Sequence, residues 1–225
     1  MSPKNLPVAA SLALMTLVGL TSRDAHAQAC GMGEVDFYGT ERAAVSRAEG
    51  LLENGEPQKA AAILQHMWPH LREAVPVASS VPVIAYGVRL MALAVVRADG
   101  NVPSDLGWSS WTAGERAGNV AWGIRRLRML AAADPDNPSV KTDLGEALSR
   151  APATREEARV MLEALDHVNG VTSPEGYAAL SLVRSAVGDV TGAELATSDC
   201  QRHALNVMQQ CASGVQASPS LTALR

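Results

Sequence analysis

The chain has 225 residues and a formal net charge of −4, from 19 basic and 23 acidic side chains. An acidic protein of this kind has no general electrostatic attraction to nucleic acid or to anionic lipid. Alanine is abundant while only one Phe and three Tyr occur, which favours closely packed helices over a sheet of aromatic and β-branched residues.

The first 27 residues have the layout of a secretory signal peptide. Lys4 precedes an apolar run from Leu6 to Leu20, and the small-x-small triplet Ala25-His26-Ala27 follows it. The run is shorter than the roughly 20 residues that a transmembrane helix needs. We therefore expect cleavage after Ala27 and export to the periplasm or the cell exterior. A lipoprotein is the alternative, because Cys30 follows a small residue and could carry a lipid. The excess of Arg over Lys favours a bacterial protein.

Residues 28–39 are expected to form an N-terminal extension, and a first pair of helices follows. Thr40 is a candidate N-cap for a helix that ends near Gly55, and Pro57 begins the second helix, where a missing N–H is tolerated. Apolar residues recur at steps of three and four along both segments, as they do on one face of a helix. Pro69 ends the pair.

The segment from Val81 to Val96 is the most apolar part of the mature chain, and Arg89 is its only charge. Its length, the proline at its start and the central arginine predict a buried helix rather than a membrane span. An insert is expected at about residues 101–114. A further helix then runs to the break at Asp134-Pro135-Asp136-Asn137-Pro138.

Two more pairs are expected after this break. Pro138 and Pro174 begin their first helices, and Thr154 with Glu157 predicts a capping box for the second helix of the third pair. Residues 213–225 are predicted to be a disordered tail. Since no strand-like alternation appears, the predicted fold class is all-α: about four stacked antiparallel helix hairpins in residues 40–212, with a C-terminal capping helix.

A recurring spacing supports this organisation. In two places an Ala follows a Gly by five residues, as in two antiparallel helices whose turn needs Gly and whose crossing needs a small side chain. The pattern resembles a tetratricopeptide repeat over about residues 41–201. The positions that carry it are Ala48, Leu51, Gly55, Ala60 and Leu64, then Leu144, Gly145, Leu148, Ala158 and Leu162, then Tyr177, Leu180, Gly188 and Ala193. Three features depart from the repeat: the insert, one extra residue before Ala158 in the third pair, and Arg184 in place of an apolar residue. A non-repetitive helical bundle is the alternative.

The resemblance implies that the first helix of each pair lines a concave groove that binds another protein or peptide. Transferred position by position, it selects Arg42, Val45, Glu49, Glu53, Thr142, Glu146, Ser149, Glu175, Ala178 and Leu182. We therefore expect a non-catalytic protein of the cell envelope that needs no cofactor. A lipid-anchored assembly factor and an exported enzyme are the alternatives. A deep polar pocket with histidine or paired carboxylates would favour the enzyme, and an open groove would favour binding.

Other residues that could carry chemistry have simpler interpretations. His66 and His70 are four residues apart, which suits a shared metal, but Pro69 interrupts their helix and we expect ordinary surface histidines. The sequence contains neither a Gly-x-Ser-x-Gly elbow nor a phosphate-binding glycine loop. Trp108 and Trp111 in the insert could anchor a partner, although such loop pairs more often fold over a neighbouring apolar surface.

The three cysteines suggest one disulfide. In a continuous helix Cys200 and Cys211 would lie about 16 Å apart, beyond the roughly 7 Å that a disulfide bridges. They can pair only if the chain turns between them, near residues 203–206. We favour this pair over a bridge to Cys30, because the same turn would fold the last helix back as the cap that repeat arrays need. Cys200 is otherwise interpreted as a small core residue.

Overall fold

The computed structural model describes residues 40–72, 82–102, 107–204 and 211. These residues form eight α-helices and no strand, so the fold is all-α as predicted. The helices are α1 (Glu41–Glu53), α2 (Pro57–Met67), α3 (Pro82–Arg97), α4 (Ala113–Ala133), α5 (Pro138–Ser149), α6 (Arg155–His167), α7 (Pro174–Ala186) and α8 (Val190–His203). The predicted signal peptide, the expected N-terminal extension, Cys30 and the predicted C-terminal tail lie outside the described residues.

Proline begins four of these helices. Pro57, Pro82, Pro138 and Pro174 are the first residues of α2, α3, α5 and α7. Proline suits this position because its missing N–H would have no partner inside the helix, and its fixed φ angle already matches the helix. The helix starts predicted from these prolines are confirmed.

Side-chain caps differ from the prediction at one point. Thr154 makes no capping hydrogen bond to α6. A 3₁₀ turn over Pro152–Thr154 precedes that helix, and the Thr154 hydroxyl instead donates to the Leu148 carbonyl at 2.6 Å. The predicted capping box is therefore wrong. A reciprocal capping box does occur at the start of α4, between Thr112 and Glu115.

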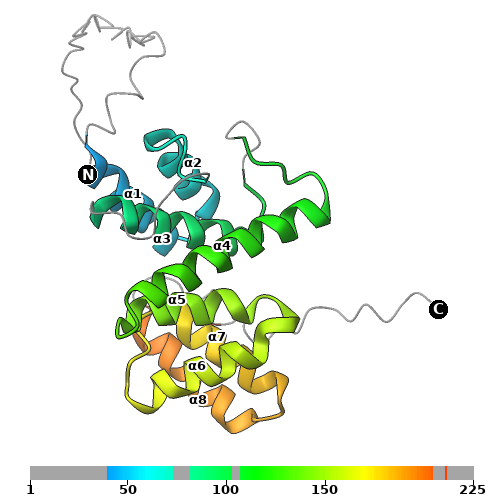
Figure 1. Ribbon diagram of the computed structural model, residues 1–225. Coiled ribbons are helices and arrows are strands. Elements are labelled where there is room, and N and C mark those ends of the chain that lie inside the picture. The colour runs from blue at the N-terminus through cyan, green and yellow to red at the C-terminus, as the bar shows by residue number, and fades with distance from the viewer. Residues whose placement is uncertain (1–39, 73–81, 103–106, 205–210, 212–225) are drawn as a thin grey trace, which may run out of the picture.

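Consecutive helices pack in pairs. The contacts α1 with α2, α3 with α4, α5 with α6 and α7 with α8 are joined by contacts between successive odd-numbered helices, α1 with α3, α3 with α5 and α5 with α7. In Figure 1 the long helix α4 passes between the group formed by α1, α2 and α3 and the group formed by α5 to α8. This packing is consistent with a helical solenoid whose odd-numbered helices share one face.

Small residues allow the helices of a pair to approach closely. Ala60 in α2 and Ala158 in α6 are completely buried. A Cβ atom placed on Gly145 of α5 would lie 2.6 Å from Cγ of Leu162 in α6, well inside van der Waals contact. The repeat positions selected from the sequence thus include buried small residues where helices of a pair pack, with a close approach at Gly145.

Candidate functional site

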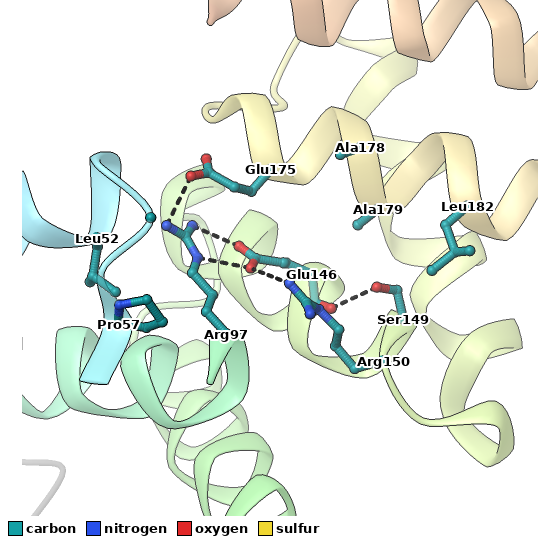
Figure 2. A pocket seen from close by; sticks show the side chains of 11 residues that line it. Leu52, Pro57, Arg97, Glu146, Ser149, Arg150, Glu175, Ala178, Ala179 and Leu182 are labelled. Carbon is teal, nitrogen blue, oxygen red and sulfur yellow. Dashed lines mark hydrogen bonds and ion pairs between the residues drawn. The ribbon is translucent and has the colours of Figure 1, made fainter. Parts of the chain in front are cut away.

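A cleft with a volume of about 360 Å³ lies between the α1–α2 turn, the end of α3, and helices α5 and α7 (Figure 2). Two turns shape it. Gly55, at φ +73°, gives the sharp connection that carries Leu52 and Pro57 to one wall. Gly100, at φ +72°, follows α3 and lies so close to the Arg116 carbonyl of α4 that a Cβ atom would be 2.1 Å from its oxygen. Only glycine fits this second turn.

Arg97, the last residue of α3, joins three helices inside the cleft. Its Nε and Nη2 atoms donate to Oε1 and Oε2 of Glu146 in α5 at 2.9 and 2.8 Å, and its Nη1 donates to Oε1 of Glu175 in α7 at 2.9 Å. The planar guanidinium suits such a forked contact with a carboxylate. The arginine and both glutamates are largely shielded from solvent, with side-chain exposures of 12%, 2% and 15%.

Charge and burial set the ionisation of this cluster. Burial by itself lowers the pKa of Arg97, but attraction to Glu146 and its hydrogen bonds outweigh burial, so the net pKa shift is upward and the group stays cationic. Burial raises the pKa of the Glu175 carboxyl, and attraction to Arg97 offsets only part of that rise. Repulsion from Glu146 and Glu53 raises it further.

The rest of the cleft combines one more cation with an apolar wall. Arg150 places Nη1 3.4 Å from Oδ1 of Asp99 and Nη2 3.8 Å from Oε1 of Glu146. Figure 2 shows Ala178, Ala179 and Leu182 along α7, on the side opposite Leu52 and Pro57. The full lining is Leu52, Gly55, Pro57, Arg97, Glu146, Ser149, Arg150, Glu175, Ala178, Ala179 and Leu182.

The structure brings together half of the groove residues selected from the sequence. Glu146, Ser149, Glu175, Ala178 and Leu182, which come from the third and fourth pairs, all line this one cleft. The spacing of the repeat thus selected neighbours from two helices separated by α6.

The groove residues of the first pair lie elsewhere. Arg42, Val45 and Glu49 line a separate hollow between α1 and the start of α3, together with Tyr86. Glu53 is exposed at the end of α1 and lines neither hollow. The first pair therefore contributes Leu52, Gly55 and Pro57 to the cleft, and not the residues that the repeat geometry selected.

Thr142 is a wrong assignment. Its side chain is completely buried, its hydroxyl donates to the Pro138 carbonyl at 2.8 Å, and its oxygen accepts from the Thr172 backbone N–H at 3.3 Å. It supports the loop that leads into α7 and is not accessible to a partner.

A second network of charges lies next to the first-pair hollow. The Tyr86 hydroxyl donates to Glu49, and burial together with this bond raises the pKa of Tyr86 to about 12. Arg89, one turn further along α3, forms an ion pair with Asp143 of α5. Burial raises the pKa of Asp143 to about 6, although the bond to Arg89 acts in the opposite direction. This pair adds a second ionic contact between α3 and α5.

The two tryptophans of the insert have different environments. Trp108 is 2% exposed, packs edge-on against Trp122 with ring centroids 5.0 Å apart, and donates its indole N–H to Gln65 Oε1 at 3.3 Å. The Arg72 guanidinium lies 4.4 Å above its ring. Trp108 therefore folds over the core and cannot anchor a partner. Trp111 is 82% exposed.

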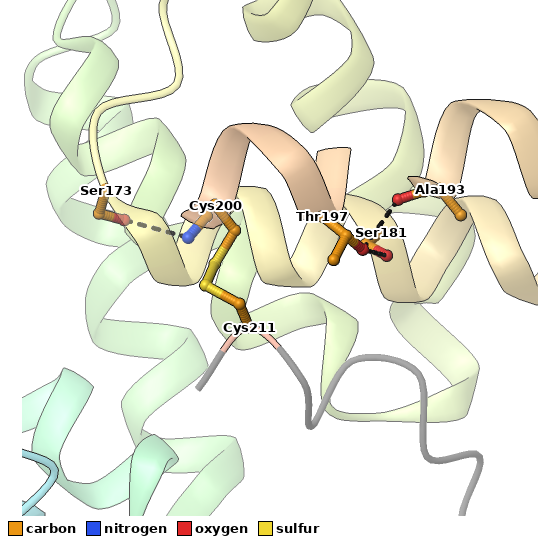
Figure 3. Close-up of a disulfide and its surroundings, with 7 residues drawn as sticks. Ser173, Ser181, Ala193, Thr197, Cys200 and Cys211 are labelled. Atoms are coloured by element: carbon orange, nitrogen blue, oxygen red, sulfur yellow. Dashed lines mark hydrogen bonds between the residues drawn. A yellow bond between two sulfur atoms is a disulfide. The ribbon is translucent and has the colours of Figure 1, made fainter. Parts of the chain in front are cut away.

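The structure joins Cys200 and Cys211 in a disulfide with a Cα–Cα distance of 5.8 Å (Figure 3). Helix α8 ends at His203, inside the segment where the sequence requires a turn. Both cysteines are buried, and the His203 ring stacks on Tyr177 of α7 with centroids 5.1 Å apart. The predicted capping helix falls on residues that the structure does not describe, apart from Cys211.

His66 and His70 are both exposed. Across the described ranges, no three His, Cys, Asp or Glu side chains are grouped so that they could hold a metal ion.

Arg97 is the central residue that sequence reasoning missed. It lies one residue beyond the apolar run 81–96 and before the insert, where the repeat spacing is interrupted. A charged residue at the end of an almost entirely buried helix was the available signal, because such a charge needs a partner from a neighbouring element.

The fold and the cleft define an all-α protein of paired helices with a charged, partly apolar hollow on the face of the odd-numbered helices. No protein-family model matches the chain, and no curated protein or solved structure shows significant similarity to it. In the part of the chain that the structure describes, no helix is long and apolar enough to span a membrane.

Proposed function

We propose that this chain is an exported, tetratricopeptide-like helical-repeat protein that binds a protein or peptide partner in the cell envelope and catalyses no reaction. One observation carries the proposal: five positions selected by the repeat spacing, on two helices, line one cleft. These are Glu146, Ser149, Glu175, Ala178 and Leu182.

The size and lining of the cleft suit a segment of another chain. Its volume lies at the lower end of the range of about 300–1,000 Å³ for ligand pockets, which is enough for a few side chains. Leu52, Ala178 and Leu182 offer apolar contact, while Glu175 and Arg150 at the cleft offer polar contact. Pockets that combine an apolar wall with a few placed polar groups give both affinity and orientation.

The enzyme alternative has one observation in its favour, since Glu146 and Glu175 form a pair of carboxylates in the cleft. Both carboxylates, however, hydrogen bond the same guanidinium of Arg97. Among the described residues, the lining contains no histidine or cysteine that could act with them as a nucleophile or second acid–base group. The Arg97 side chain held between two carboxylates is typical of a structural ion-pair network. This arrangement favours a partner-binding role of the cleft over proton transfer.

Site-specific photo-crosslinking tests the proposal. A photoreactive amino acid placed at Leu182, inside the cleft, should give a defined adduct with a partner in cell envelopes of the native host. The same group at Leu195, which is 61% exposed on α8, is the matched control and should not give that adduct. Equal adducts at both positions, or none at Leu182, would contradict binding in the cleft.

Export is supported by the layout of residues 1–27 and needs its own test. Intact-mass analysis of the protein recovered from a bacterial periplasm should give a mature chain beginning at Gln28 or its cyclised form. A lipid-modified Cys30 would instead establish the membrane-anchored alternative.

A further inference from the structure

The charges around the cleft are unequal, and this inequality bears on the kind of peptide that fits. The guanidinium groups of Arg97 and Arg150 are the cations. The carboxylates of Glu146 and Glu175 line the cleft, and Asp99, outside the lining, pairs with Arg150. In this ion-pair network three carboxylates face two guanidinium groups, which leaves a formal excess of one negative charge.

Both arginines of the cleft already have carboxylate partners. Arg97 already donates to Glu146 through Nε and Nη2 and to Glu175 through Nη1. Arg150 contacts Asp99 and Glu146. A ligand carboxylate at Arg97 would have to displace Glu146 or Glu175. At Arg150 it would compete with Asp99 and Glu146 and would enter a network in which carboxylates already outnumber guanidinium groups.

Glu175 stands at the end of a strip on α7 that matches a long basic side chain. Glu175, Ala178 and Leu182 are spaced i, i+3 and i+7, so they lie on one face of the helix, and all three line the cleft (Figure 2). The strip is about 10 Å long at the helical rise. Lysine and arginine place an apolar stem against such a surface and a charged head at its polar end.

A carboxylate can accept several hydrogen bonds, and Glu175 accepts one from Arg97. We infer that the cleft selects a lysine or arginine side chain of the bound peptide, with Glu175 accepting its charged head and Ala178 and Leu182 contacting its stem. This inference rests on the proposed function and adds the chemical class of the ligand.

The test uses the purified exported protein and four short fluorescein-labelled peptides in an Ala/Ser background, identical except for Arg, Lys, Gln or Glu at one central position. Binding is measured by fluorescence anisotropy. The Arg and Lys peptides should bind at least about tenfold more tightly than the Gln peptide, as expected for a charge-assisted hydrogen bond. The Glu peptide should bind most weakly. The preference should decrease as salt is raised.

Two variants locate the preference. Glu175→Gln removes the charge while Arg97 keeps its two bonds to Glu146, and it should bring the Arg and Gln peptides to within about twofold of each other. Glu163→Gln, on α6 and paired with Arg159, is the matched control and should keep the preference. Ala178→Lys is a second, independent variant that places a cation in the cleft, and it should abolish binding of the basic peptides. Circular dichroism and urea midpoints establish that each variant is folded.

The outcomes separate this inference from the proposed function. Cross-peaks of Ala178 and Leu182 in amide NMR spectra report whether a peptide occupies the cleft. The inference is overturned if all four peptides shift these cross-peaks but the Arg and Lys peptides bind no more tightly than the Gln peptide. It is also overturned if the Glu175→Gln variant still binds the Arg and Lys peptides more tightly. Both outcomes leave peptide binding in the cleft intact. If no peptide shifts them, the inference is overturned, and the crosslinking experiment at Leu182 decides separately on the proposed function.

Discussion

Gly145→Ala should destabilise the protein, although alanine is the better helix former. Gly145 lies in the middle of α5, where Gly→Ala alone gains about 1 kcal/mol of helix propensity. The new methyl group would lie 2.6 Å from both Cγ and Cδ2 of Leu162, and Leu162 is completely buried. Because Cγ is close to the main chain, a rotation of the leucine tip cannot relieve the contact, and α5 and α6 must separate.

Overpacking of this kind costs about 1–3 kcal/mol, so the net effect should be a loss of up to about 2 kcal/mol in the free energy of unfolding. Gly118→Ala is the matched control. Gly118 is exposed within α4, and a Cβ atom there would meet no heavy atom within 4 Å. The same substitution should therefore stabilise the protein by up to about 1 kcal/mol.

Urea unfolding followed by circular dichroism measures both variants. A double-mutant cycle with Leu162→Ala then isolates the contact. Leu162→Ala alone should cost about 2–5 kcal/mol, and the double variant should cost less than the sum of the single ones, because the new methyl group occupies space that the leucine leaves. If Gly145→Ala is as stable as Gly118→Ala, or if the cycle is additive, the crossing of α5 and α6 is not limited by this contact.

Three further predictions concern other parts of the molecule. Ala60→Leu should lower the free energy of unfolding by about 1–3 kcal/mol, because Ala60 is completely buried on α2, which packs against α1 and α3. An unchanged urea midpoint would mean that the site has room for the larger side chain. The Cys200–Cys211 disulfide closes a loop with a sequence separation of 11, and its reduction should lower the free energy of unfolding by up to about 3 kcal/mol. Unfolding with and without dithiothreitol measures this loss, and Cys211→Ser is the comparison. For Asp143, the pKa is raised from 3.8 to about 6, so between these values the native state holds its proton more tightly than the unfolded chain does. Stability relative to Asp143→Asn should therefore fall as pH rises through this window, by at most about 1.4 kcal/mol per pH unit, and a flat or rising difference would contradict the raised pKa.

Helix starts and small-residue crossings could be predicted because they depend on local chemistry. Pro57 and Pro174 can begin a helix but cannot continue one, so their positions mark boundaries without knowledge of the fold. Gly145 and Ala158 stand out because two helices in close contact have no room for larger side chains. Thr154 shows the limit of this reasoning, since its hydroxyl could also bond a carbonyl in the preceding turn, and the proline before it decides in favour of that turn.

The cleft could be predicted only in part, because it depends on how far the helices curve toward one another. Glu146 and Glu175 were found because the first helices of the third and fourth pairs carry residues of the repeat pattern, among them Gly145 and Leu180. Arg97 was not found, because the insert that follows α3 breaks the spacing. Thr142 was assigned to the groove because it lies on the helix face that the repeat selects. It is buried because the segment around Thr172 covers it, which the repeat spacing does not reveal.

The ion pair from Arg97 to Glu175 spans 78 residues and connects the second helical pair to the fourth, passing over the third. In an ordinary array each repeat contacts only its neighbours, so the ends can fray while the middle stays folded. Here the last pair is tied back to an earlier one, and Leu52 of the first pair shares a cleft with Leu182 of the fourth. Loss of either end removes one wall of the cleft. The chain should therefore unfold as one cooperative unit, and its pairs, unlike those of a simple repeat protein, cannot be deleted or exchanged one at a time.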